Sequence, residues 1–247
     1  MPDLATRLDH SCFPQPSLGS SVWRYMPLAK FISLVQTETL FLSRLDLMAD
    51  PHEAANPKLM LEQRSELNRL SGSPALYNTV MSEHSRRARL ATFVNCWALS
   101  EFESEALWKL FAVDGDGIAI NTTYQALVDT IEPDDELYLG SITYIDYENE
   151  SFPDGEPMYP VMHKRKAFAH EREVRLVKHF PQYLDASSAP PSGVSVSINI
   201  DALIKRLYIS PYCPEWYYET VKGIVVRLAP SLEPRIKWSP MTTAPRF

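Results

Sequence analysis

Apolar positions change their spacing along the first part of the chain, and each change marks an element. Residues 21–25 (SVWRY) are typical of a short strand, and Pro27 then stands at the start of a helix, where a missing amide hydrogen does no harm. One face of this helix is apolar at the helical period, with Leu28, Phe31, Ile32 and Val35. Residues 39–43 (TLFLS) predict a second short strand. The chain is therefore expected to open as strand, helix, strand.

Short strands and helices continue to alternate along the rest of the chain. Helices are predicted over residues 58–70, 75–90, 104–111, 123–131, 161–170 and 215–228. Strands are predicted over residues 90–98, 118–121, 137–147, 173–178, 193–200, 206–210 and 235–238. Ser104 can cap its helix, because its side-chain oxygen can accept an amide of the first turn. Residues 149–160 read as an irregular loop, and the whole pattern favours an α+β fold.

The organisation of the chain is predicted to be simple. Residues 1–20 are polar and rich in Pro and Ser, so we expect an N-terminal arm over the surface. Residues 21–247 contain no internal repeat and no linker that divides them, so we expect a single α+β domain.

Composition and charge narrow the classes of protein. Apolar residues make up 45% of the 247 residues and charged residues 22%, which is ordinary for a globular chain with a buried core. The formal net charge is −7 without a long basic run, so non-specific binding to DNA is not expected. Residues 86–89 and 164–166 could each form a local basic patch, although we favour a solvated helix face for both.

Cysteine usage and the N-terminal sequence favour the cytoplasm. Cys12, Cys96 and Cys213 are far apart, without the paired spacing of a disulfide framework or a zinc site. The first ten residues lack the basic and apolar regions of a signal peptide, and no apolar run approaches the length that crosses a bilayer. We therefore expect a reducing, cytoplasmic setting and no membrane partner.

The sharpest local pattern is residues 171–175 (EREVR). In an extended strand, Glu171, Glu173 and Arg175 would share one face, with successive members about 7 Å apart. Two carboxylates and a guanidinium in this arrangement can position a hydroxyl or stabilise a developing cation. The alternative is a charge row exposed on an edge strand, or an internal salt bridge to Arg24.

Arg24 stands between two aromatic residues on a predicted strand. If Trp23 and Tyr25 pack inward, the Arg24 guanidinium points to the opposite face, where it could hold a phosphate or a carboxylate. The alternative is a lone surface arginine.

Residues 50–53 (DPHE) offer three ligand-type side chains in four positions. A metal interpretation combines Asp50, His52 or Glu53 with Glu171 or Glu173. We favour a turn and helix cap, in which Asp50 accepts backbone amides and Glu53 completes the first turn. No metal is therefore required.

Cys96 lies on the predicted buried strand of residues 90–98, and Trp108 lies in the helix that follows. No histidine is placed to activate the thiol, so Cys96 is interpreted as a small core residue. Three histidines that could carry protons flank the strand after Glu171, and each is interpreted as structural or exposed: His163, His170 and His179.

The order of these motifs resembles that of a widespread bacterial domain family of unknown function. Its members combine an aromatic-Arg/Lys-Tyr opening, Asp-Pro-x-Glu after the second strand, a Cys and Trp centre, and Glu-x-Glu-x-Arg. The matching residues are Trp23-Arg24-Tyr25, Asp50-Pro51-His52-Glu53, Cys96 with Trp108, and Glu171-Arg172-Glu173-Val174-Arg175. The resemblance covers roughly residues 21–180 and implies kinship of fold without an activity. His52 departs from the apolar aromatic that is common in the family.

The chain also resembles ADP-ribosyltransferases of the Arg-Ser-Glu type. Arg24 in VWRY, Ser43 in LFLSR and Glu173 match that group in type and order. The serine motif of the group is Ser-Thr-Ser, whereas residues 42–44 are Leu-Ser-Arg. The resemblance implies an α+β fold in which split antiparallel β-sheets lie around a cleft with flanking helices.

The same resemblance implies NAD-dependent ADP-ribosyl transfer, by a toxin or an anti-phage effector, with NAD as co-substrate and an undefined macromolecular acceptor. Glu173 would be catalytic, because carboxylate density stabilises an oxocarbenium-like ribose, and Glu171 would orient the acceptor. The cofactor-binding contacts would come from Arg24 on the pyrophosphate, Tyr25 or Phe41 against nicotinamide, and Ser43 on its ribose.

Two functions of other classes stay open. One is a metal-dependent nuclease or hydrolase, against which the acidic balance and the absence of a Glu-x-Lys signature stand. Its residues would be Asp50, Glu53, Glu171 and Glu173. The other is a non-catalytic binding or regulatory domain, whose ion pairs fix strand register.

Overall fold

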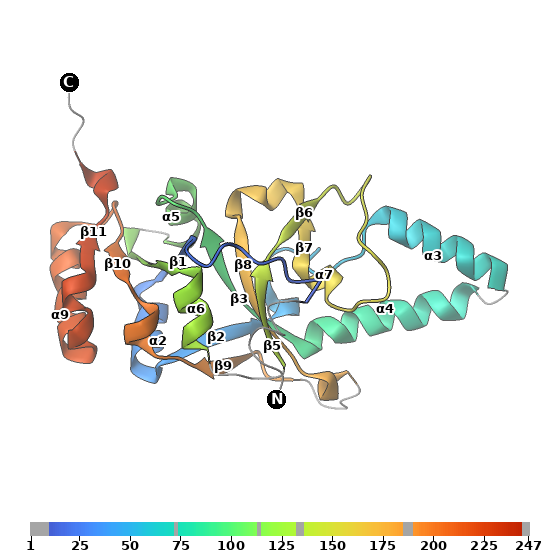
Figure 1. The fold of residues 1–247 in the computed structure, drawn as a ribbon, viewed down its shortest axis with the longest axis horizontal. Coiled ribbons are helices and arrows are strands. Elements are labelled where there is room, and N and C mark those ends of the chain that lie inside the picture. The colour runs from blue at the N-terminus through green and yellow to red at the C-terminus, as the bar shows by residue number, and fades with distance from the viewer. Residues whose placement is uncertain (1–9, 72–73, 113–114, 132–135, 185–189, 244–247) are drawn as a thin grey trace, which may run out of the picture. The chain divides into compact units, whose positions relative to one another are not determined.

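The computed structural model describes residues 10–71, 74–112, 115–131, 136–184 and 190–243 (Figure 1). The chain separates into two compact units, and each unit gathers three stretches of sequence. Unit 1 comprises Met1–Gln15, Phe41–Cys96 and Pro133–Val194, and unit 2 comprises Pro16–Leu40, Trp97–Glu132 and Ser195–Phe247. Three of the five passages from one unit to the other fall inside a strand, so no linker marks them in the sequence: β2 (Thr39–Arg44), β3 (Thr92–Leu99) and β9 (Gly193–Ser197).

Unit 1 contains a sheet in which β8 is a central strand. Besides the parts of β2, β3 and β9 named above, its elements are α3 (Lys58–Ser71), α4 (Pro74–Ala91), β5 (Leu137–Ser141), β6 (Thr143–Ile145), α7 (Tyr159–Met162), β7 (His163–Arg165) and β8 (Glu173–His179). Strand β8 pairs with β5 in antiparallel register and also with β3, and β3 pairs antiparallel with β2. Strands β6 and β7 form a separate parallel ladder. Both faces of β8 are buried, from Glu173 to Val177.

Unit 2 is built on a ladder whose strands are antiparallel except for the last pair. Its elements are β1 (Ser21–Pro27), α2 (Leu28–Thr37), α5 (Glu105–Phe111), β4 (Gly117–Thr123), α6 (Tyr124–Thr130), α8 (Ile200–Leu203), β10 (Arg206–Ile209), α9 (Glu215–Leu228) and β11 (Ile236–Trp238). The end of β3 pairs with β1, β1 with β4, and β4 with β10, whereas β10 and β11 are parallel. Aromatic side chains fill its core, including Trp23, Tyr25, Trp108 and Tyr208.

Short 3₁₀ turns complete the described chain. They are η1 (Leu45–Leu47), η3 (Lys166–Glu171), η4 (Pro181–Tyr183), η5 (Pro230–Arg235) and η6 (Pro240–Thr242). No helix of the described residues is long and apolar enough to cross a membrane.

The end of the expected N-terminal arm belongs to the core of unit 1. Residues 1–9 of that arm lie outside the described residues, but Cys12 and Phe13 are 2% and 1% exposed. The Phe13 ring stacks on Tyr138 with ring centroids 5.0 Å apart. Gly140 makes room for this segment, because a Cβ there would lie 2.8 Å from the Phe13 Cα. The expectation of a surface arm is therefore wrong for these residues, since two apolar side chains outweigh the polar composition around them.

Most predicted elements are present at the predicted positions. The strand, helix, strand opening is confirmed, and the Ser104 side chain accepts the Leu107 amide at 3.3 Å as the helix cap. The helix predicted over residues 161–170 is wrong, because α7 ends at Met162 and the next three residues pair with β6. The strand predicted over residues 137–147 is divided into β5 and β6.

The mixed composition of helices and mainly antiparallel strands is confirmed. Two finer parts of the fold prediction stay predictions. They are the split sheets around a cleft and the single domain after residue 20, since each concerns the relation between the two units.

The packing of the N-terminal segment predicts a large effect of Phe13→Ala. Deleting a buried phenylalanine ring typically costs about 3–5 kcal/mol, from lost burial and from the cavity that remains. We expect chemical denaturation to report a loss of that size in the free energy of unfolding. The matched control is Leu18→Ala, whose side chain is 50% exposed and whose loss should change this free energy by less than about 0.5 kcal/mol. Equal effects of the two substitutions would contradict a core role for Phe13.

Candidate functional site

The Glu-x-Glu-x-Arg motif lies where a 3₁₀ turn passes into a central strand. Glu171 ends η3, Arg172 has a φ of 44°, and Glu173 begins β8. Because Arg172 takes a left-handed conformation, the two glutamates do not follow the alternation of one strand. The expected common strand face for Glu171 and Glu173 is therefore wrong, whereas Glu173 and Arg175 do share a face of β8.

Arg175 is the centre of a buried ion network in unit 1. Its side chain is fully buried, and its Nε donates to Glu173 Oε1 at 2.6 Å. Its two terminal nitrogens donate to the Glu53 oxygens at 3.1 and 3.3 Å, and Nη1 also donates to the Val161 carbonyl at 2.7 Å. Each of the three guanidinium nitrogens donates at least one hydrogen bond, so Arg175 fixes Glu53 and Glu173 relative to β8.

Lys164, from β7, adds a second cation to the same carboxylates. Its Nζ lies 3.2 Å from Glu53, 2.7 Å from Glu171 and 3.4 Å from Glu173. The most exposed of these three carboxylates is Glu171, whose side chain is 16% exposed against 1% for Glu53 and 4% for Glu173. We call Glu53, Lys164, Glu171, Glu173 and Arg175 the ion cluster. The cluster is open to solvent chiefly at Glu171.

The ion cluster carries one excess negative charge when all its members are ionised, because three carboxylates face two cations. Burial opposes the ionisation of Glu173, but the charges of Arg175 and Lys164 and the hydrogen bonds to the carboxylate lower its pKa to about 2. Burial likewise opposes protonation of Lys164, yet Glu173 and Glu53 raise its pKa above the ordinary value. These mutual shifts keep Glu173 and Lys164 ionised at neutral pH.

Cys96 lies beside Glu173 and is unsuited to act as a nucleophile. Burial, followed by the Glu173 charge, raises the pKa of the Cys96 thiol well above its usual range. The thiolate is the reactive form, so a thiol in this surrounding is inert at neutral pH. The geometry supports the interpretation of Cys96 as a packing residue.

Residues 50–53 form a turn and also supply two carboxylates that make ion pairs with distant residues. Asp50 accepts the His52 amide at 3.0 Å, as the turn interpretation predicts, and also pairs with Arg165 at 2.8 Å. Glu53 does not complete a helix turn, because its carboxylate is buried in the ion cluster.

The carboxylates that the metal interpretation combined do converge, but they converge on Lys164 and Arg175. Among the described residues no group of three or more His, Cys, Asp or Glu is arranged to hold a metal ion. An ammonium 2.7–3.4 Å from three carboxylates already stands at the centre that a cation would take.

The sheet of unit 1 brings Ser43 onto the face that carries the ion cluster. Ser43 lies opposite Val94 in the β2–β3 ladder, and directly opposed side chains share a face. Cys96 follows Val94 by two positions, so it lies on that face as well, and its thiol hydrogen-bonds Glu173. Ser43 and Glu173 are therefore on one face, with β3 between their strands.

Phe41 is on the same face of β2, two positions before Ser43. Its side chain is 53% exposed, whereas Leu40 and Leu42 on the other face are buried. An exposed aromatic ring on the face that carries Ser43 is available to stack on a planar ligand. Gly193 leaves room for it, because a Cβ at Gly193 would lie 2.0 Å from the Phe41 Cζ.

Arg24 and Tyr25 belong to β1 of unit 2. Trp23 and Tyr25 are both buried, as expected, and the Arg24 guanidinium lies 5.9 Å from the centre of the Trp97 ring. The Tyr25 hydroxyl accepts the Ser104 amide at 2.8 Å, and Tyr25 is 7% exposed. Stacking of Tyr25 on a ligand therefore requires the aromatic side chains packed around it to move. The pyrophosphate role of Arg24 stays a prediction.

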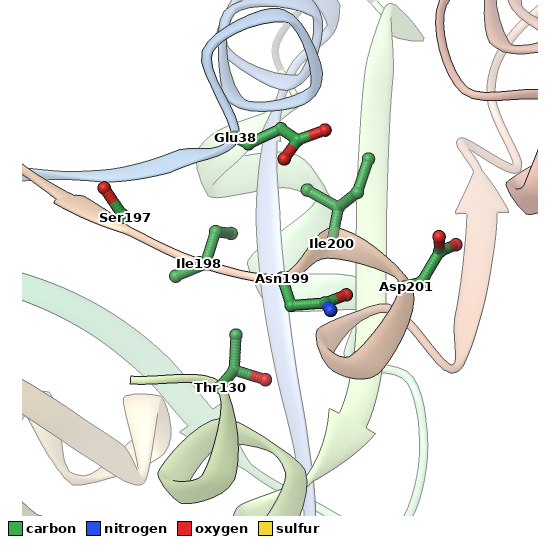
Figure 2. A pocket seen from close by; sticks show the side chains of 7 residues that line it. All are labelled: Glu38, Thr130, Ser197, Ile198, Asn199, Ile200 and Asp201. Carbon is green, nitrogen blue, oxygen red and sulfur yellow. The ribbon is translucent and has the colours of Figure 1, made fainter. Parts of the chain in front are cut away.

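A hollow of about 440 Å³ lies in unit 2 and contains none of the residues predicted from the sequence (Figure 2). It is lined by Glu38, Thr130, Ser197, Ile198, Asn199, Ile200 and Asp201. Its two acidic side chains are exposed, and Asp201 pairs with Arg235 at 3.6 Å. None of these lining residues belongs to the ion cluster.

No protein-family model matches the sequence, and neither does any curated protein. The chain is similar to a solved structure of DarT from Thermus sp. 2.9 in complex with ADP-ribosylated ssDNA. The identity is 8% and the TM-score 0.43, over 94% of this chain and 99% of that chain. A likeness of this extent fixes neither the fold family nor the activity of this chain.

The depressed pKa of Glu173 predicts a pH-dependent effect of Glu173→Gln. The folded pKa of about 2 lies below the reference value of 4.5, so Glu173 stabilises the fold above pH 4.5. This contribution, about 3 kcal/mol, is lost as the pH falls from 4.5 towards 2. We expect urea unfolding to show Glu173→Gln less stable than the wild type at pH 7, with a gap that narrows through that window. The matched control is Glu66→Gln, which removes an exposed pair with Arg69 and should show no gap.

Proposed function

We propose that this chain transfers ADP-ribose from NAD to a macromolecular acceptor, as a toxin or an anti-phage effector. The observation that carries the proposal is the common face of Ser43 and Glu173 in unit 1, with exposed Phe41 beside Ser43. Serine and glutamate are two of the three residues by which the sequence resembles Arg-Ser-Glu transferases. Strand order and side-chain alternation place them on one face without reference to that resemblance.

The charge of the ion cluster suits the reaction. Breaking the bond between nicotinamide and ribose leaves an oxocarbenium-like centre, and nearby carboxylates stabilise its positive charge. Glu173 is ionised at neutral pH and belongs to a cluster with one excess negative charge. We assign to Glu173 the stabilisation of the ribose centre and a hydrogen bond to a ribose hydroxyl.

The exposure of Glu171 suits the second half of the reaction. Its side chain is more exposed than the other carboxylates of the ion cluster, so it is the one that a macromolecular acceptor reaches first. We assign to Glu171 the orientation of the acceptor nucleophile, whose attack on the ribose carbon completes the transfer. The proton of the nucleophile passes to this carboxylate.

Two of the contacts assigned to NAD come from one face of β2. Ser43 would orient the nicotinamide ribose, and the exposed Phe41 ring would stack against nicotinamide. Arg24 would hold the pyrophosphate as a bidentate donor, and Tyr25 is a second candidate for stacking. The absence of non-specific DNA binding also stays a prediction, so single-stranded DNA belongs among the acceptors to be tested.

Purified protein should be stabilised by NAD in thermal unfolding and should release nicotinamide from it. We expect Glu173→Gln to lower kcat for nicotinamide release by about 10²–10³-fold, because it removes charge stabilisation from the transition state. Phe41→Ala should instead raise KM for NAD about tenfold, the loss of one stacking contact. Chromatography of nicotinamide from reactions with protein, RNA and single-stranded DNA measures both.

Glu66→Gln is the control for this prediction, since its carboxylate lies on the exposed surface of α3. Absence of both NAD-dependent stabilisation and nicotinamide release in the wild type would reject the transferase proposal. A missing acceptor cannot explain that result, because binding needs no acceptor.

A further inference from the structure

We propose that Lys164 is a positioning residue that holds the Glu171 carboxylate beside that of Glu173, an inference that rests on the proposed function. The sequence pattern alone does not mark Lys164 as a site residue. Its ammonium contacts both glutamates, at 2.7 Å and 3.4 Å, and so joins the exposed carboxylate to the buried one.

The rest of the ion cluster forms a frame for this contact. Arg175 binds Glu53 through two nitrogens and Glu173 through Nε, and all three side chains are almost completely buried. Glu171 stands outside this frame, on the 3₁₀ turn that precedes β8. The ion pair with Lys164 ties Glu171 to the frame, because the same ammonium also contacts Glu53 and Glu173.

The backbone around Lys164 fixes where its ammonium stands. Lys164 lies opposite Tyr144 in the β6–β7 ladder, and the Tyr144 hydroxyl accepts the Glu173 amide at 2.8 Å. The pairing of Tyr144 with Lys164 therefore fixes the position of Lys164 relative to the first residue of β8. The Lys164 side chain is 7% exposed and its Nζ lies 4.8 Å from the centre of the Phe168 ring. Lys164 is thus enclosed, and it acts on a substrate through Glu171 and Glu173.

Loss of the ammonium changes the charge balance of the cluster. Three carboxylates would then face Arg175 alone, and the excess negative charge would rise from one to two. Like charges at this distance favour uptake of a proton by one carboxylate. Removal of Lys164 should therefore release Glu171 from its position and also raise the pKa of Glu173.

The test compares Lys164→Gln, which keeps a donor but no charge, with Lys164→Arg, which keeps the charge. Lys166→Met is the matched control, because Lys166 is 56% exposed and pairs with Glu150 outside the ion cluster. In Lys164→Gln we expect kcat for transfer to fall about tenfold, with KM for NAD unchanged within threefold. The acid limb of the kcat profile should move up by about one pH unit, and Lys164→Arg should restore most of the loss.

A double-mutant cycle tests whether Lys164 acts through Glu171. If it does, Lys164→Gln in a Glu171→Gln background lowers kcat much less than it does in the wild type. Full additivity of the two substitutions overturns the inference, as does a rise in KM with unchanged kcat. A loss of activity that Lys164→Arg does not restore also overturns it, provided that thermal unfolding shows that variant to be folded.

A second experiment distinguishes failure of the transferase proposal from failure of the inference about Lys164. If the wild type releases no nicotinamide, the transferase proposal is rejected, and the role of Lys164 is decided by carboxyl ¹³C NMR of labelled glutamate, assigned with Glu173→Gln. We then expect the Glu173 titration midpoint to rise by about one pH unit in Lys164→Gln and to stay at the wild-type value in Lys166→Met. An unchanged midpoint in Lys164→Gln overturns the inference without reference to activity.

Discussion

A fully buried guanidinium is the constraint on which unit 1 depends. Taking Arg175 out of water costs several kcal/mol, and only well-placed anions offset that cost. Glu173 and Glu53 supply the charge, and the Val161 carbonyl accepts a further hydrogen bond. Because these partners come from β8, from the turn after η1 and from α7, the position of Arg175 specifies how three distant stretches of sequence meet. Replacement of one partner alone would leave a buried charge uncompensated.

The sequence predicts most of the helices and strands, but it does not predict the side-chain contacts that hold distant segments together. Helical and strand periods are local, so the strand, helix, strand opening and β8 itself were predictable. In contrast, contacts between residues that are far apart in the sequence cannot be predicted from local spacing. Nothing in the sequence spacing predicts that Glu53 contacts both Arg175 and Lys164. The basic residues 164–166 predict a solvated helix face, whereas Lys164 is buried on strand β7.

Two errors have the same physical origin. The polar composition of residues 10–15 predicts a surface position, but burial of Phe13 against Gly140 decides where they lie. Strand alternation predicts one face for Glu171 and Glu173, but the left-handed conformation of Arg172 interrupts it. In both cases a single residue overrides the average of its neighbours. The interruption also gives the two carboxylates different exposure, since the Glu171 side chain is 16% exposed and that of Glu173 is 4% exposed.

An ammonium group, and not a bound metal ion, supplies the positive charge between the three carboxylates of the ion cluster. A divalent ion in that position could dissociate, and the ionisation of the carboxylates would then follow its concentration. Lys164 is covalently part of β7, so its charge is always present when unit 1 is folded. Glu53, Glu171 and Glu173 raise the affinity of Lys164 for its proton beyond the opposing effect of burial, and that proton in turn keeps Glu173 ionised. The charge of the ion cluster is therefore a property of the fold and is independent of a diffusible cation.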